Sequence, residues 1–87
     1  MDEEATLKEA EANMRTGAFE FSQADRSGDD ERKSAASRKL TQAAQTYADL
    51  RGIPALSATV MNFDDTTKSV LTTALYGLRD KNGNIWL

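Results

Sequence analysis

Two stripes of apolar residues at helical spacing frame a short polar segment in the first half of the chain. The first stripe is Leu7, Ala10, Met14, Ala18 and Phe21, and the second is Ala36, Leu40, Ala43, Tyr47 and Leu50. The segment between them, residues 25–30, is typical of a helix end followed by a new N-cap. Because so short a connection lets two stripes bury each other only side by side, we expect an antiparallel helical hairpin.

The expected helices of this hairpin cover residues 3–24 and 29–51. Gly17 lies inside the first, where glycine costs about 1 kcal/mol relative to alanine. We therefore expect another backbone to approach closely at Gly17. Gly52 and Pro54 form a stop signal for the second helix.

The second half of the chain predicts one further helix and a short tail. At about 100° per residue a third apolar stripe runs from Val60 to Leu78, which predicts a helix over residues 57–78, best supported from residue 65. Asp64 and Asp65 could instead cap a shorter helix and leave residues 57–62 extended. In the tail, residues 79–87, Asn82-Gly83 is a tight-turn signal. We expect a short hairpin or a reversed tail that docks Trp86.

Together these elements predict a single, mainly α domain spanning residues 1–87. Its helical hairpin and third helix would form a three-helix bundle with a short C-terminal turn or hairpin. Hydrophobic residues make up 39% of the chain, enough for a folded core. Many of them are alanines, however, so we expect only about 3–5 kcal/mol of net stability unless a partner adds buried area.

The composition argues against catalysis and against a metal or cofactor. The chain contains neither cysteine nor histidine, which removes thiolate chemistry, the commonest general base and the commonest transition-metal ligand. No phosphate-binding glycine loop or nucleophile motif occurs. Asp80, Asn82 and Asn84 match the first ligands of a calcium loop, but Ile85 stands where that loop needs glycine. We interpret them as turn residues and expect no enzyme activity.

No apolar run approaches the length of a membrane span, and the acidic start of the chain is unlike a signal peptide. We therefore expect a cytoplasmic protein without membrane contact.

Charge is distributed unevenly along the chain. Residues 1–31 carry ten acids and three bases, whereas residues 32–51 carry five bases and one acid. An acidic helix beside a basic one suits the antiparallel hairpin, with Glu20 and Asp25 near Arg32 and Lys39. Exposed pairs contribute only about 0.2–1 kcal/mol each, so they favour the pairing without driving it.

Two nucleic-acid hypotheses follow from these charges. The bases that open the second helix, Arg32, Lys33, Arg38 and Lys39, could contact phosphates as a nucleic-acid-binding regulator. They scatter around the helix, which favours a solvated face that pairs with the first helix. The acids could alternatively imitate DNA in an inhibitor, although helix capping already explains most of their positions.

The first helix also carries a second line of residues, which we call the outer stripe: Ala5, Ala12 and Phe19. These residues are spaced by sevens and lie about 120–160° from the main apolar stripe. They would either contact the third helix within the fold or form an exposed interface for a partner or a second copy. Trp86 is the second candidate anchor for a partner.

These observations favour a small acidic protein–protein interaction module, acting as an adaptor, inhibitor or regulatory subunit. We expect it to bind a protein partner or to self-associate as a dimer, and we do not expect nucleic acid as its ligand. Such a compact acidic domain is compatible with a phage or another mobile element as its source.

Overall fold

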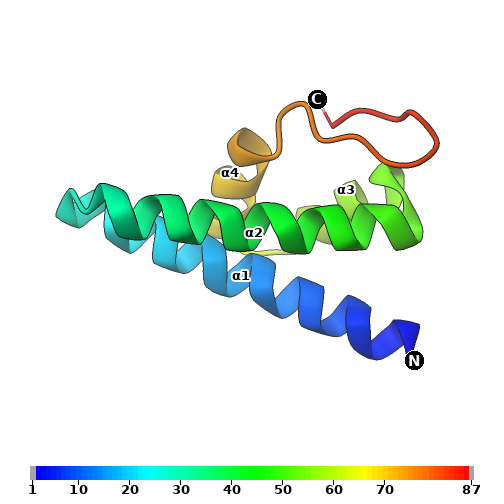
Figure 1. The fold of residues 1–87 in the computed structure, drawn as a ribbon, viewed down its shortest axis with the longest axis horizontal. Coiled ribbons are helices and arrows are strands. Elements are labelled where there is room, and N and C mark those ends of the chain that lie inside the picture. The colour runs from blue at the N-terminus through cyan, green and yellow to red at the C-terminus, as the bar shows by residue number, and fades with distance from the viewer. Residues whose placement is uncertain (1, 87) are drawn as a thin grey trace.

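The computed structural model describes residues 2–86, and most of them lie in helices (Figure 1). In chain order these are α1 (Glu3–Ser27), α2 (Asp30–Arg51), α3 (Ile53–Met61) and α4 (Asp65–Ala74). The prediction of a mainly helical chain is therefore confirmed for the described residues. Its detail differs, because two short helices stand where one third helix was expected.

Short polar residues set the ends of α1 and α2. The carboxylate of Asp2 accepts a hydrogen bond from the Glu4 amide at 3.0 Å, and that of Asp29 accepts one from the Arg32 amide at 3.1 Å. Gly28 ends α1 in the left-handed region, with a φ of 72°, where a Cβ atom would be strained. This tight connection turns α2 back along α1, and Figure 1 shows the two long helices running antiparallel.

Gly17 lies where α1 and α2 approach closely. A Cβ atom at this position would lie only 3.0 Å from Cβ of Leu40 and 3.1 Å from its backbone nitrogen. Such distances are tighter than ordinary Cβ contacts, so a side chain here would require α2 to shift in a close-packed interior. The prediction of a close backbone approach at Gly17 is therefore confirmed.

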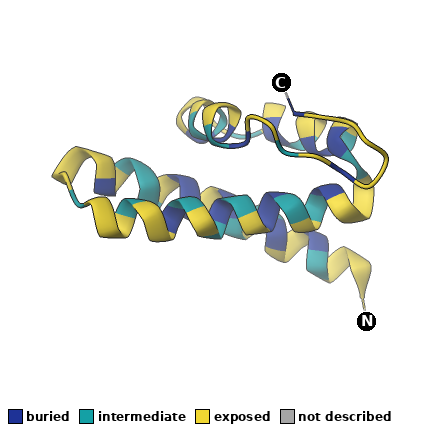
Figure 2. Cartoon of the chain, turned by 45° about the horizontal axis from the view of Figure 1, so that its top comes forward, coloured by how far each residue is buried: buried dark blue, intermediate teal, exposed yellow. Residues whose placement is uncertain are grey.

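The helices α3 and α4 and the tail form a second layer over the hairpin (Figure 2). The largest fully buried side chains come from both layers, and they are Met14, Leu40, Leu56, Val60, Leu71 and Leu75. Burying a side chain of this kind stabilises the fold by about 1.5–3 kcal/mol. Contact between the two layers, rather than within the hairpin alone, therefore forms the core.

The continuous helix predicted over residues 57–78 is wrong. α3 begins at Ile53, directly after Gly52, and has Pro54 in its first turn, where the fixed φ of proline suits a helix start. The chain leaves the helix after Met61, and Asp64 has an extended ψ of 162°. The alternative with residues 57–62 extended is also wrong over α3, whereas the shorter helix from Asp65 is confirmed.

The tail reverses direction and returns to the helices. Arg79 and Ile85 form an isolated antiparallel bridge, and the Trp86 amide donates to the Leu78 carbonyl at 2.8 Å. The carboxylate of Asp80 organises this turn by accepting hydrogen bonds from the amides of Asn82 and Asn84, each at 2.9 Å.

The same carboxylate also joins the tail to the start of α3. Its second oxygen accepts the Ile53 amide at 2.8 Å, and Asp80 is buried. Because hydrogen bonds from Ile53 and then from the turn stabilise the charged form, the pKa of Asp80 lies below its ordinary value. Both oxygens thus serve the fold, in line with a turn role for this residue.

Candidate protein-binding surface

The outer stripe faces solvent. Ala5, Ala12 and Phe19 are all exposed, and 61% of the Phe19 surface is accessible. The buried positions of α1 lie on the opposite side of the helix, among them Ala10 and Met14. The interpretation of the stripe as a contact inside the fold is therefore wrong, and the exposed interpretation remains.

Phe19 also lines a groove of about 410 Å³ between α1 and the start of α4. The residues around this groove are Arg15, Phe19, Ser22, Gln23, Arg26, Asp64, Thr66 and Thr67. α1 supplies one wall with an aromatic ring and two arginines, and α4 supplies the other with short polar side chains. Aromatic rings and arginines are the residue types that concentrate binding energy in protein interfaces.

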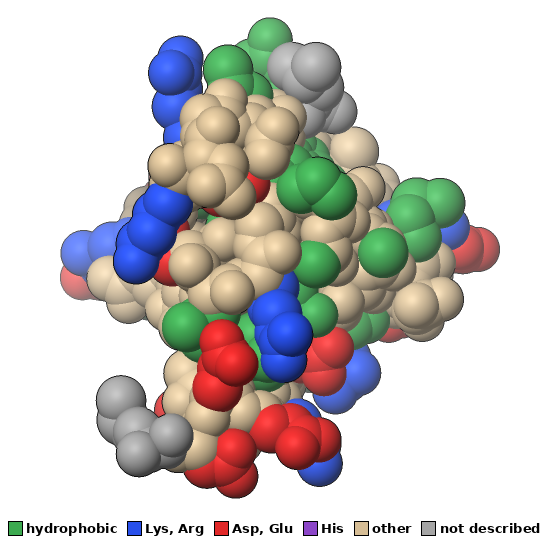
Figure 3. Space-filling model, turned by 90° about the vertical axis from the view of Figure 1, so that its right-hand side faces the viewer, with side chains coloured by type: hydrophobic (Ala, Val, Ile, Leu, Met, Phe, Trp, Pro, Cys, Tyr) green, Lys and Arg blue, Asp and Glu red, His purple; other side chains and the backbone are tan. Residues whose placement is uncertain are grey.

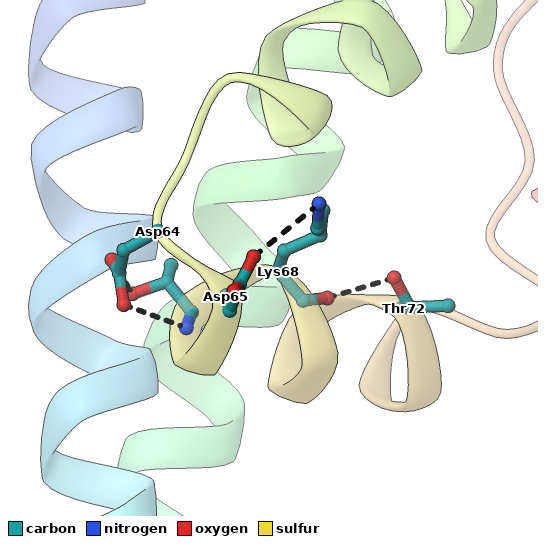
Figure 4. A network of polar contacts seen from close by, with 5 residues as sticks. Asp64, Asp65, Lys68 and Thr72 are labelled. Atoms are coloured by element: carbon teal, nitrogen blue, oxygen red, sulfur yellow. Dashed lines mark hydrogen bonds and ion pairs between the residues drawn. The ribbon is translucent and has the colours of Figure 1, made fainter.

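Asp64 positions the second wall of this groove by capping α4. Its carboxylate accepts the Thr67 hydroxyl at 2.6 Å and the Thr67 amide at 3.2 Å, and Figure 4 shows it at the start of α4, beside α1. These hydrogen bonds from Thr67 hold the pKa of Asp64 below its ordinary value. Asp65, on the other side of the helix, pairs with Lys68 at 3.7 Å.

Neither arginine of the groove forms an ion pair within residues 2–86, although Asp64 lines the same groove. The ion pairs within residues 2–86 join Lys33 to Asp25, Lys39 to Glu20, Arg51 to Glu3 and Lys68 to Asp65. Arg15 instead lies over the Phe63 ring, 5.2 Å from its centroid, a cation–π contact that holds the guanidinium in place. Two positive charges beside an exposed aromatic ring thus remain available to a ligand.

Trp86 does not belong to this surface. Only 6% of it is accessible, and its indole nitrogen donates to the Thr72 carbonyl at 3.3 Å. The proposed role of Trp86 as a partner-binding residue is therefore wrong for this conformation, because the side chain lies in the core. A buried indole needs such a hydrogen-bond acceptor, and the last turn of α4 provides it.

The basic residues of α2 have partners or are scattered. Lys33 donates to Asp25 at 2.7 Å and Lys39 donates to Glu20 at 2.9 Å, so these two lysines face α1. Hydrogen bonding to Asp25 raises the pKa of Lys33. Glu20 lies near Lys39, one of the two bases expected there, whereas Asp25 pairs with Lys33, which that prediction did not name. Arg32 and Arg38 remain exposed.

Sequence reasoning missed the groove. Arg15 and Arg26 could have been found, because together with Lys8 they are the bases of the first 31 residues and lie within about 20° of each other at 100° per residue. Asp64, Thr66 and Thr67 could not, since only the tertiary fold brings the start of α4 beside α1.

No protein-family model, curated protein or solved structure matches this chain. Over residues 2–86, no helix is long and apolar enough to cross a membrane, and no group of three or more acidic residues is arranged to hold a metal ion. The geometry of the surface is therefore the basis for assigning a function.

Proposed function

We propose that this chain is a non-enzymatic protein-binding module, acting as an adaptor, inhibitor or regulatory subunit. Its contact surface would be the outer stripe of α1 together with the groove beside Phe19. The single observation that carries the proposal is that Phe19 is 61% exposed and lines one groove with Arg15 and Arg26. A large exposed ring beside two arginines that form no ion pair within residues 2–86 favours binding over folding as the role of these residues.

The surroundings of Phe19 differ from those of the other exposed hydrophobic side chains. Leu50, Met61, Tyr76 and Ile85 are also exposed. Met61, Tyr76 and Ile85 line two other grooves, and neither of these contains two arginines. Tyr76 is the most exposed of these residues, at 77%. It lies near the end of α4, in a groove whose lining residues include none from α1, and therefore serves as a matched control.

The test compares Phe19→Glu with Tyr76→Glu in a pull-down from the native host. Both variants should keep the helical circular dichroism of the wild type, because both replace exposed side chains. We expect Phe19→Glu to lose the captured protein and Tyr76→Glu to retain it. Equal retention by both variants would contradict the proposed surface, as would unfolding of Phe19→Glu.

A further inference from the structure

The charges along α1 favour a second copy of this chain as the occupant of the groove beside Phe19. We propose that two copies associate through the exposed side of α1, with the two α1 helices antiparallel. This inference rests on the proposed function and names the partner. It is carried by complementary charges on the two halves of one helix side.

One side of α1 carries the acids Glu4 and Glu11 in its first half, with Lys8 beside them, and the bases Arg15 and Arg26 in its second half. At about 100° per residue, Glu4, Glu11, Arg15 and Ser22 fall within about 40° of one another. Glu4 and Glu11 form no ion pair within residues 2–86. Figure 3 shows the acidic side chains gathered at the end of the molecule where α1 begins.

An antiparallel arrangement brings these opposite charges together. A two-fold axis across the helix pair sets each flank of α1 against the same flank of its copy, in reversed order. With the axis near Asn13, Glu11 of one copy lies opposite Arg15 of the other, and the relation repeats by symmetry. Glu4 lies opposite Ser22 and about one turn from Arg26.

Side-chain sizes along the outer stripe agree with this register. Phe19 of one copy lies between Ala5 and Lys8 of the other, so the large ring meets a small residue and a cation that can contact its face. The first turns of one copy would thereby enter the groove between Phe19 and Thr66 of the other. Ala12 lies beside the axis, where a small side chain lets two helices approach closely.

A parallel arrangement would not bring these charges together. In a parallel pair each flank of α1 would face the opposite flank of its copy, so Glu11 of one copy would no longer lie opposite Arg15 of the other. The pairing of Glu11 with Arg15 is therefore specific to the antiparallel orientation.

The first experiment exchanges the charges of one pair. Glu11→Arg carries two bases at these positions, and Arg15→Glu carries two acids, so each variant repels its own copy. We expect sedimentation equilibrium to show a wild-type dimer that weakens with salt and a dissociation constant raised about tenfold or more in each variant, roughly 1.4 kcal/mol. Mixing the two variants should restore a dimer, because both opposed pairs are then complementary.

The second experiment determines the orientation. The chain contains no cysteine, so a single introduced cysteine gives an unambiguous crosslink. In the antiparallel dimer, Ala12→Cys lies beside the axis and should form a disulfide between copies. Ala5→Cys should not, because the two copies of position 5 would be about 24 Å apart.

Several outcomes would overturn this inference. A wild-type chain that stays monomeric at millimolar concentration excludes the second copy as the occupant, as do charge variants that dimerise like the wild type. A mixture that remains monomeric, or a crosslink through position 5, excludes the antiparallel arrangement. These results leave the proposed function standing, since that depends on whether Phe19→Glu loses a different bound protein.

Discussion

Phe19 and Trp86 are two aromatic residues of the same chain that differ in their exposure to solvent. Phe19 lies in the middle of a long helix and is exposed, whereas Trp86 lies in the tail and is almost completely buried. The helical repeat of α1 determines the exposure of Phe19, because it places this residue on the side away from the core. The tail has no such repeat. Hydrogen bonds from the Trp86 amide to the Leu78 carbonyl and from its indole to the Thr72 carbonyl hold this residue in the core. Position along the chain is therefore a poor guide to which aromatic residue is exposed.

Of the two aromatic residues, we expect the buried Trp86 to have the larger effect on the free energy of unfolding when it is replaced. Trp86→Ala removes a side chain that belongs to the same core cluster as Leu71 and Leu75, and such truncations destabilise a domain by about 3–5 kcal/mol. For a chain with so small a core, this loss should leave much of the population unfolded at 25 °C. Urea titration followed by circular dichroism measures it, and a change below about 1 kcal/mol would show that Trp86 is not part of the core.

A smaller effect concerns the pH dependence of the tail that carries Trp86. The pKa of Asp80 in the folded state is below its ordinary value of 3.8, mainly because the Ile53 amide donates to it. A lowered pKa stabilises the fold above pH values near 4, and that contribution is lost as the pH falls through the folded-state pKa. Asp80→Asn should therefore be less stable than the wild type at neutral pH.

The difference between the two proteins should shrink as the pH drops below about 4. Free energies of unfolding measured at neutral pH and at successively lower values test this directly. A difference that stays constant across that range would show that the charge of Asp80 does not contribute, and that only the shape of its side chain matters. Subtracting the two proteins removes the contribution of Asp64, whose pKa is also lowered.

The smallest effect on folding should come from replacing the exposed ring. Phe19→Ala removes a side chain that is mostly in water, and alanine favours a helix more than phenylalanine does. We expect the free energy of unfolding to stay unchanged or to rise by up to about 0.5 kcal/mol. Thermal unfolding of the dilute protein tests this, and a loss of several kcal/mol would place Phe19 in the core with Trp86.

The two long helices could be predicted from the sequence because each carries a stripe long enough to define its buried side. The stripe from Val60 to Leu78 was also correct about burial, since Val60, Leu71 and Leu75 all lie in the core. It was wrong about continuity. Two helices packed on the same layer bury the same positions as one, so periodicity alone cannot detect the break before Asp64.

The candidate surface was predictable only in part, for a related reason. The exposure of Ala5, Ala12 and Phe19 follows from a helical wheel once the buried side of α1 is known. The groove needs the position of Thr66 relative to Arg15, which depends on how α4 packs, and no local pattern contains that information. Trp86 needed the same knowledge, because only the packed helices offer the carbonyl of Thr72 to its indole.

The hydrogen bond between Asp80 and Ile53 joins residues that are 27 positions apart, and it has a consequence for how the molecule opens. The Ile53 amide can exchange its proton with solvent only when the carboxylate of Asp80 moves away. Release of the tail therefore also removes a hydrogen bond from the first turn of α3, and we expect the two segments to open together as one unit of local unfolding. Hydrogen exchange at the Ile53 amide, just after α2, would in this way report on release of the C-terminal tail.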